Sequence, residues 1–246
     1  MESETLEVKR LGTSAIIAAF NEEKTLSEVL QVLTRHPLID EVIVVSDGST
    51  DGTVEIARSH DVTTIALREN HGKGYAMRVG VEHASHEVLF FVDGDMLNLT
   101  SQHIEALVRP VTRRECDMNI GIRHRGPVRN FLHLKMQCGP VLSGIRVMRR
   151  EVFESVPLQY QERFKIEAAL NYFCSLEGFE QRHTIIRKLG HVIKEQKRGL
   201  GVGLSGRWLM SREVFLLLFD LYVFQTWRWT ETAELPAADY DLFDTE

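Results

Sequence analysis

The chain has 246 residues, of which 43% are hydrophobic and 26% are charged. These proportions exclude a disordered chain and a fibrous one, and they are typical of a soluble globular protein. At this length we expect one α/β domain with a large buried core. Lysine and arginine number 29 against 35 aspartate and glutamate residues, a net charge of −6. A mildly acidic chain is a poor candidate for wrapping nucleic acid, so no nucleic-acid partner is expected.

Cysteine usage and the apolar segments indicate a cytoplasmic protein. The three cysteines are Cys116, Cys138 and Cys174. They are odd in number and lack metal-like spacing, which predicts buried thiols in a reducing compartment. Residues 1–10 contain no apolar run of a secretory signal. The longest apolar stretch, 214–224, is interrupted by Asp220 and is too short to span a bilayer.

Short apolar runs alternate with amphipathic ones over the first hundred residues. Four runs rich in Val, Ile or Phe predict strands buried on both faces, at 14–19, 41–46, 62–67 and 87–92. Helical spacing predicts helices between them, at 25–34, 53–60 and 75–84. A series of this kind forms right-handed crossovers and a doubly wound sheet flanked by helices.

Ligands of such sheets bind beyond the carboxyl ends of the strands. Each predicted strand is followed there by a polar or glycine-rich segment. In chain order these segments are Phe20-Asn21-Glu22-Glu23, residues 47–53 (DGSTDGT), residues 70–74 (NHGKG) and Asp93-Gly94-Asp95. Four independent solvated loops would rarely show this pattern together. The four strand ends therefore predict one shared site.

Asp93 and Asp95, spaced i, i+2 after a buried strand, can both reach one hard divalent cation. Mg²⁺ and Mn²⁺ favour carboxylate oxygens that are shared with the phosphates of a substrate. An ordinary Asp-Gly turn is the alternative interpretation of this tripeptide. The ten histidines include His124, His133 and His183, which lie at no ligand spacing, so no histidine metal site is predicted.

The other strand ends suggest contacts with a nucleotide. Asp47 and Glu22 each follow a strand and can accept hydrogen bonds from a base or a ribose, although each is also a plausible helix cap. Lys73 stands at a helix start, where it can meet a diphosphate with help from the helix dipole. The alternative is a solvated lysine in a glycine turn. Neither a P-loop nor a dinucleotide-binding G-x-G-x-x-G occurs, which argues against those two classes.

Taken together, the four segments resemble the family 2 glycosyltransferases of GT-A fold. The matching stretches are AIIAAFNEEKTL (15–26), VSDGSTDGT (45–53), NHGKGYA (70–76) and FVDGD (91–95). The likeness is greatest to the branch that contains dolichyl-phosphate mannose synthase, and it covers residues 13–100 strongly and extends more weakly to 206. The resemblance implies a metal-dependent transfer of a sugar from a nucleoside diphosphate sugar, with Mg²⁺ or Mn²⁺ as cofactor and with inversion at the sugar carbon.

The resemblance also implies a role for individual residues on the donor side. Base, ribose, sugar and diphosphate would be bound by Ala18, Phe20, Glu22, Asp47, Lys73, Asp93 and Gly94. Asp95 and Asp93 would hold the metal. The family's first strand motif usually has a proline and a tyrosine where Ala18-Ala19-Phe20 stand, and Leu97 occupies the position where the mannosyl branch often has glutamine. That leucine leaves the third protein ligand of the metal without a candidate.

On the acceptor side, Ser143-Gly144-Ile145-Arg146 is similar to the family's S-G-x-R segment, and residues 163–170 to its G-[FY]-x-x-E segment. Glu167 would be the general base for a hydroxyl acceptor. A lipid-phosphate acceptor is already ionised and would need no strong base. Without the resemblance, Glu167 is simply a helix acid near a helix start. Basic residues for acceptor or diphosphate are Arg123, Arg146, Arg198 and Arg207.

The last third of the chain changes in charge twice. Residues 182–212 hold eight lysines or arginines and one acid, and residues 207–229 are apolar nearly all round. That segment predicts a C-terminal helix, either a buried core or homodimer element or a peripheral contact with the inner membrane surface. Residues 231–246 form an acidic tail with six acids, which we expect to be disordered or to lie on the surface. We therefore predict one domain over 1–230, with a nucleotide-sugar half at 13–100 and an acceptor half at 101–206.

Two other functions remain compatible with this pattern. A sugar-nucleotidyltransferase has a similar sheet, but it would carry a basic glycine-rich loop after the first strand, where Glu22 and Glu23 stand instead. A catalytically silent nucleotide-sugar-binding protein would keep the fold without turnover. The presence of Asp93, Asp95 and Glu167 favours the enzyme.

Overall fold

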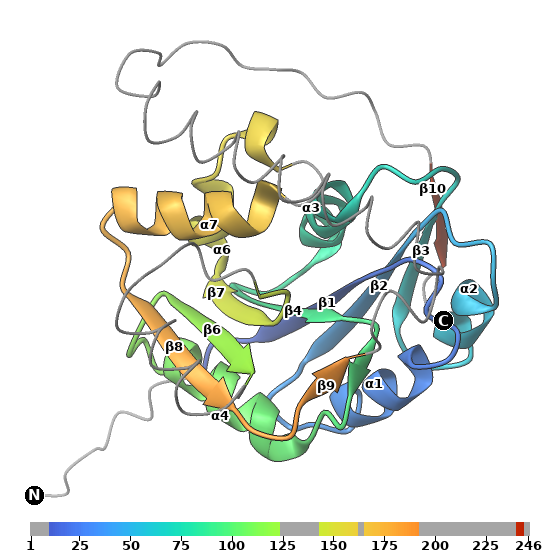
Figure 1. The fold of residues 1–246 in the computed structure, drawn as a ribbon, viewed down its shortest axis with the longest axis horizontal. Helices are drawn as coiled ribbons and strands as arrows, with labels where there is room; N and C mark the ends of the chain where they lie inside the picture. Colours follow the sequence, from blue (N-terminus) through green and yellow to red (C-terminus); the bar gives the residue numbers. More distant parts are fainter. Residues whose placement is uncertain (1–9, 124–142, 162–164, 192–239, 244–246) are drawn as a thin grey trace, which may run out of the picture.

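The computed structural model describes residues 10–123, 143–161, 165–191 and 240–243 (Figure 1). Within them the chain forms an eight-stranded sheet in the order β10-β3-β2-β1-β4-β7-β6-β8, and a two-stranded sheet, β5-β9. The strands of the large sheet are β1 (Thr13–Ala19), β2 (Glu41–Asp47), β3 (Thr63–Leu67), β4 (Val88–Asp93), β6 (Met118–Arg123), β7 (Arg146–Arg149), β8 (Gln181–Ile186) and β10 (Tyr240–Phe243). The small sheet pairs β5 (Met96–Leu97) with β9 (Gly190–His191).

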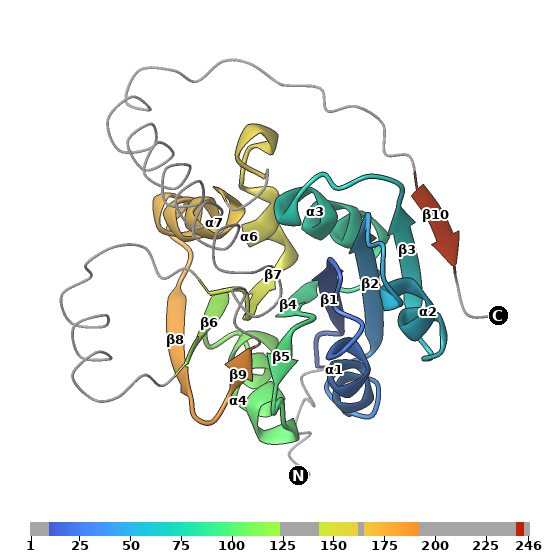
Figure 2. The ribbon, with the colours of Figure 1, turned by 45° about the vertical axis from the view of Figure 1, so that its right-hand side comes forward.

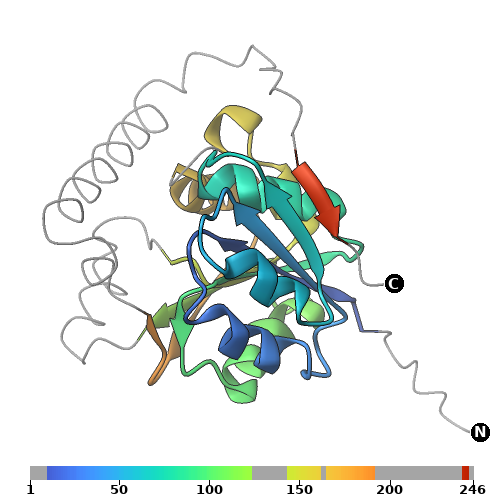
Figure 3. The same cartoon turned by 90° about the vertical axis from the view of Figure 1, so that its right-hand side faces the viewer.

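Helices cover both faces of the large sheet (Figure 3). They are α1 (Leu26–Leu33), α2 (Thr53–Arg58), α3 (Lys73–His83), α4 (Ser101–Thr112), α6 (Arg150–Glu154) and α7 (Lys165–Leu176), with a 3-10 turn η1 (Leu158–Tyr160). One apolar cluster joins the sheet to α1, α2 and α4. Two others join the opposite face to α3, α6 and α7. The molecule is therefore a three-layer α/β fold, as predicted.

The central strands are apolar on both sides because they are buried on both sides. Ile17 belongs to the cluster under α1, and its neighbour Ile16 belongs to the cluster under α6 and α7; both are fully buried. Strands β3, β2, β1 and β4 run parallel, whereas β7 pairs antiparallel with β4 and β6. The mixed sheet thus places the second half of the chain, from β6 to β8, directly beside β4.

The predicted strands and helices of the first half agree with the structure to within two residues at most ends. The main difference is α3, which begins at Lys73 and not at residue 75, directly after Gly72 with its φ of 93°. A positive φ of this kind is readily adopted by glycine and stops a helix from extending backwards. Lys73 is therefore the first residue of α3, at the carboxyl end of the parallel strands.

Part of the predicted acidic tail is a strand, and the rest of residues 231–246 lies outside the described residues. Residues 240–243 form β10, which pairs antiparallel with β3 and adds an edge strand to the sheet (Figure 2). The predicted apolar helix at 207–229 lies outside the described residues, as does the predicted end of the acceptor half at residue 206. No helix in the described ranges is long and apolar enough to cross a membrane.

Cys116 and Cys174 are buried free thiols, as predicted, and Cys138 lies outside the described residues. Burial raises the pKa of the Cys116 thiol to about 11 and that of Cys174 to about 12. Neither thiol is therefore ionised at neutral pH, which fits packing roles and not nucleophilic ones.

Candidate active site

The segments after β1 and β2 are joined to each other by hydrogen bonds. Asn21 has a φ of 55°; its backbone N–H donates to the Ser49 hydroxyl at 3.1 Å, and its side-chain oxygen accepts from the Thr50 N–H at 2.8 Å. The Glu22 N–H donates to the Thr53 hydroxyl at 2.8 Å. These contacts bring Phe20 and Glu22 to the same edge of the sheet as the end of β2. The sequence predicted this proximity from parallel topology alone.

Asp47, the last residue of β2, organises the segment that follows β3. Its two carboxylate oxygens accept hydrogen bonds from the backbone N–H groups of His71 and Gly72, both at 2.8 Å. Burial raises the pKa of Asp47, and the two backbone hydrogen bonds offset part of that rise. The carboxylate thus holds the turn that leads into α3. Asp47 as a residue is 4% exposed. A role in base or ribose binding stays a prediction.

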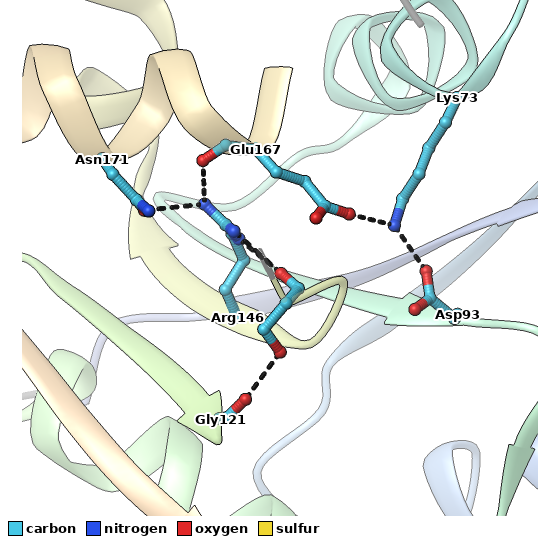
Figure 4. A network of polar contacts seen from close by, with 7 residues as sticks. Lys73, Asp93, Gly121, Arg146, Glu167 and Asn171 are labelled. Carbon is cyan, nitrogen blue, oxygen red and sulfur yellow. Dashed lines mark hydrogen bonds and ion pairs between the residues drawn. The ribbon is translucent and has the colours of Figure 1, made fainter. Parts of the chain in front are cut away.

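A lysine lies between two carboxylates at the centre of the site (Figure 4). The Lys73 ammonium is 2.6 Å from Asp93 Oδ1 and 2.7 Å from Glu167 Oε1. Asp93 ends β4, and Glu167 lies in the first turn of α7, 94 positions after Lys73. Burial alone would lower the pKa of Lys73, but the two carboxylates outweigh it and raise that pKa well above its ordinary value. Lys73 is therefore a permanent cation at physiological pH.

Gly94 and Asp95 form the turn between β4 and β5. The Gly94 carbonyl accepts a hydrogen bond from the Thr25 hydroxyl at 2.8 Å, and a Cβ on Gly94 would lie 3.3 Å from Glu22 Cγ. Asp95 is 8% exposed. The Asp-Gly-Asp turn is therefore packed against the segment after β1, which places Glu22 beside it.

The donor chemistry of this turn fits a hard divalent cation. Two carboxylates two residues apart follow a buried strand, and Mg²⁺ commonly uses one or two protein carboxylates and takes its other oxygens from substrate phosphates and water. Within the described ranges, no three His, Cys, Asp or Glu residues gather closely enough to hold a metal without a substrate. A metal site at Asp93 and Asp95, completed by a diphosphate, therefore stays a prediction.

Arg146 begins β7 and is 0% exposed. Its guanidinium donates to the Ser143 carbonyl from Nε and Nη2, at 3.1 and 2.8 Å. Nη1 donates to the Glu167 carbonyl at 3.2 Å and to Asn171 Oδ1 at 3.3 Å. All of these acceptors are protein atoms, so the role in acceptor or diphosphate binding that the sequence suggested stays a prediction. Asn171 was missed, although its i+4 spacing from Glu167 on a helix places both on one face.

The remaining predicted residues lie in three places. Ala18 in β1 pairs with Asp93 of β4 and so adjoins the central carboxylate. Arg123 ends β6, where its partner in the register is Ile186 of β8. Arg198 and Arg207 lie outside the described residues. The structure thus brings Lys73, Asp93 and Glu167 together and leaves the roles of the arginines untested.

A model of one protein family, described as glycosyl transferase family 2, matches residues 14–215. The match covers most of the chain, including every element that forms the site. The chain belongs to glycosyl transferase family 2. Curated relatives include 4,4'-diaponeurosporenoate glycosyltransferases of Staphylococcus aureus strains, 33% identical in strains USA300 and COL over 113 residues. That alignment covers 44% of this chain and 30% of the relative. This chain therefore spans under a third of the length of these relatives.

Solved structures show that this family 2 chain has a GT-A fold. Glucosyl-3-phosphoglycerate synthase from Mycobacterium tuberculosis in complex with phosphoglyceric acid superposes with a TM-score of 0.70 at 23% identity, covering 87% of this chain and 80% of that one. The complex of that enzyme with Mn²⁺, UDP-glucose and phosphoglyceric acid gives 0.69 with the same coverage and identity. Its complex with Mg²⁺ and UDP gives 0.70 at 23% identity, over 87% of this chain and 79% of that one.

The match to the family model confirms the family 2 part of the predicted resemblance. The relatives and solved structures do not specifically support the dolichyl-phosphate mannose synthase branch, since they are named for glycosyl transfer to 4,4'-diaponeurosporenoate and for glucosyl-3-phosphoglycerate synthesis. The identity to the solved structures is low enough that they establish the fold alone. Donor, metal and acceptor therefore have to be argued from this chain's own residues.

Proposed function

We propose that this chain is a metal-dependent glycosyltransferase that transfers a sugar from a nucleoside diphosphate sugar to an acceptor hydroxyl, with inversion at the sugar carbon. The observation that carries the proposal is the contact of Lys73 with both Asp93 and Glu167. It brings a carboxylate from the second half of the chain to the carboxyl end of β4, where ligands of such sheets bind. Family membership makes sugar transfer the natural use of that carboxylate.

The donor would lie along the carboxyl ends of the parallel strands. Phe20 and Asp47 would face the base, Ala18 and Glu22 the ribose, and Gly94 the diphosphate. Lys73, the first residue of α3, would add its positive charge close to the diphosphate and sugar. Uridine nucleotides are the first donors to try, because the structurally similar mycobacterial enzyme has been solved with UDP and with UDP-glucose.

Asp95 and Asp93 would hold the cation, Mn²⁺ or Mg²⁺. When bound, it would act as a Lewis acid that neutralises the departing diphosphate. The ions in the complexes of the similar enzyme are of this kind.

Glu167 would act as general base. The acceptor oxygen would form a bond to the anomeric carbon while the bond from that carbon to the diphosphate oxygen breaks. The hydroxyl proton would pass to Glu167, and the nucleoside diphosphate would leave with the bonding electron pair. A lipid-phosphate acceptor, the finer form of the predicted resemblance, brings an ionised oxygen and needs no such base. The requirement for Glu167 therefore distinguishes the two acceptor classes.

The metal role is tested with Asp95→Asn, assayed by nucleoside diphosphate release with Mn²⁺ or Mg²⁺. We expect loss of metal-dependent turnover with an unchanged circular dichroism spectrum, because asparagine has the size and shape of aspartate and can occupy the same turn. Asp61→Asn, which changes an exposed carboxylate at the opposite end of the sheet just before β3, is the matched control. Full activity of Asp95→Asn would overturn the metal role.

The base role is tested with Glu167→Gln on a hydroxyl acceptor. The variant keeps the shape of the side chain but cannot take the proton, so turnover should fall by about 10²–10⁴-fold. Glu177→Gln, an exposed change just after α7, should leave turnover unaltered. If Glu167→Gln transfers to a hydroxyl as fast as the wild type, Glu167 is not the base.

A further inference from the structure

Arg146 has the largest fully buried side chain among the described residues, and it is charged. An uncompensated buried charge is costly, so a guanidinium in such a place needs acceptors on all sides. Arg146 has them in two groups. One is the Ser143 carbonyl on the turn before β7, and the other is the Glu167 carbonyl with Asn171 Oδ1 on α7. The guanidinium therefore links a turn to a helix.

The turn on one side of Arg146 lies against Asp93. Phe91 pairs with Arg146 in the β4–β7 register, so continuing by two residues on each strand brings Asp93 level with Gly144. A Cβ on Gly144 would lie 2.0 Å from Asp93 Oδ2 and 2.4 Å from Oδ1. No side chain fits there without moving the carboxylate. The Ser143 hydroxyl also donates to the Gly121 carbonyl at 2.6 Å, which anchors the turn to β6.

The helix on the other side of Arg146 carries Glu167. Glu167 and Asn171 are four residues apart on α7, so the guanidinium binds two acceptors on one face of the helix. Figure 4 shows the Glu167 carboxylate extending from this face to Lys73. The main chain of the proposed base is thus bonded to Arg146, and its side chain is bonded to Lys73.

We propose that Arg146 is a positioning residue for Glu167: it places the Glu167 carboxylate relative to Asp93 and Lys73 by bonding the first turn of α7 to the anchored Ser143–Gly144 turn. The inference rests on the proposed function. It assigns Arg146 a place behind the reacting groups and not on the diphosphate. The complete burial of its side chain and the direction of its donors toward protein carbonyls support this assignment.

A planar guanidinium suits this role, and an ammonium does not. The fork presents donors in several fixed directions, whereas a lysine has one compact charged group on a flexible stem. Arg146→Lys keeps the positive charge near Glu167 and Asp93 but loses the simultaneous contact with turn and helix. Catalytic geometry that shifts by about 1 Å can cost about 10²-fold in rate.

The test is a double-variant cycle between Arg146→Lys and Glu167→Gln on a hydroxyl acceptor. Arg146→Lys should lower kcat by about 10²-fold and leave the KM for the donor within about two-fold of the wild type. In the Glu167→Gln background the same change should cost little further, since a residue that acts through Glu167 has nothing left to position. If the fold losses in kcat of the two single variants multiply in the double variant, Arg146 has a role independent of Glu167, such as direct diphosphate binding. That result would overturn the proposal.

Two further variants keep the result interpretable. Arg150→Lys is the matched control: Arg150 donates to the carbonyls of Val81, Ala84 and His86 at the end of α3, so its loss should lower the melting temperature and leave kcat unaltered. If Arg146→Lys does not fold, Asn171→Ala removes one of the four hydrogen bonds. It should lower kcat by about 2–12-fold, and again only when Glu167 is present. Equal losses with and without Glu167 would overturn the proposal.

The cycle also separates this proposal from the function on which it rests. Absence of transfer by the wild type from every nucleotide sugar, or full turnover of Glu167→Gln, would overturn the proposed function. Loss of turnover in Glu167→Gln together with full turnover of Arg146→Lys would overturn the positioning role alone.

Discussion

Asp47 and Asp93 both end a buried parallel strand, but their carboxylates are held in different ways. Asp47 accepts two backbone N–H groups, whereas Asp93 accepts a hydrogen bond from a lysine ammonium. Backbone dipoles thus contact the carboxylate of Asp47, whereas a full positive charge contacts that of Asp93. Burial raises the pKa of Asp47, and its two backbone hydrogen bonds offset only part of that rise.

This difference predicts a pH dependence for Asp47→Asn. The folded-state pKa of Asp47 lies above its unfolded value of 3.8, so the folded protein retains the proton to higher pH. As pH rises from 3.8 through the folded pKa, the unfolded state ionises first and the contribution of Asp47 to stability falls. The free energy of unfolding of the wild type, relative to that of Asp47→Asn, should therefore be higher at pH 3 than at pH 6. Urea unfolding at both pH values measures this difference.

The asparagine side chain also has an amide NH2 group, a donor that would face one of the two backbone N–H donors, and this cost is nearly independent of pH. It shifts the difference between the two proteins by a constant amount and leaves its slope intact. Glu55→Gln, an exposed change on α2, is the control for general acid effects. A difference in unfolding free energy that grows from pH 3 to pH 6 would contradict the assigned pKa direction.

The residues that carry charge in the site were identifiable from the sequence, but their partners were not. Asp93 and Lys73 stand out by position, since one follows a predicted strand and the other stands at a helix start. Glu167 was identified through the resemblance of residues 163–170 to a family segment. The contact between Lys73 and Glu167 joins positions 94 residues apart and depends on β7 inserting between β4 and β6. Arg146 was interpreted as a ligand-binding residue, because a sequence does not show which arginine of a basic set is buried.

At the scale of elements, the parallel strands of the first half were predictable because they are buried on both faces and therefore apolar throughout. The later strands carry weaker signals. β8 has mostly half-buried or exposed residues, β5 and β9 have two residues each, and β10 lies in an acidic tail. Such strands form because a neighbour presents unpaired backbone groups, and that requirement is a property of the sheet and not of the segment.

Helix α3 is held close to the sheet by Gly80. A Cβ at this position would lie 2.4 Å from Ile16 Cγ2 on β1 and 3.4 Å from Val45 Cγ2 on β2. Both neighbours are fully buried and cannot move aside freely. The glycine thus sets the depth at which α3 packs, and with it the position of Lys73 at the start of the helix.

We therefore expect Gly80→Ala to destabilise the protein by about 1–3 kcal/mol, the usual cost of overpacking, despite the better helix propensity of alanine. Turnover at a temperature where the variant is folded should also fall, because Lys73 moves with α3. Chemical unfolding and a steady-state assay measure the two effects. Glu82→Ala, on the exposed side of the same helix, loses only an ion pair with Arg78, which is worth about 0.3–0.5 kcal/mol.

A Gly80→Ala variant as stable as the wild type would show that α3 can shift at no cost. The site would then not depend on the depth of the helix. A destabilised variant with unchanged turnover would separate the packing of α3 from the position of Lys73.

At the scale of the whole molecule, the site joins the two halves of the chain. Lys73 and Asp93 come from the segment before residue 100, and Arg146 and Glu167 from the segment after it. Strand β7 makes this connection, because it pairs with β4 on one side and β6 on the other. A ligand that contacts both carboxylates therefore binds across the two halves and stabilises them as one unit.

This arrangement predicts a single thermal transition that a donor shifts as a whole. A ligand at about 100 times its dissociation constant adds about 2.7 kcal/mol to the free energy of unfolding. With nucleoside diphosphates and nucleotide sugars tested in Mn²⁺, Mg²⁺ or chelator, we expect one base to raise the melting temperature, and more so with metal. Asp95→Asn should retain the shift seen in chelator and lose the increment due to metal.

The same melts test whether the donor contacts both halves of the chain. A nucleotide sugar should raise the melting temperature more than the corresponding nucleoside diphosphate does, because only the sugar would extend from the donor half toward Glu167. If diphosphate and nucleotide sugar give equal shifts, the second half does not contact the donor. If none of the nucleotides gives a shift, this chain does not bind a nucleotide donor on its own, and the proposed transfer would be refuted for the isolated chain.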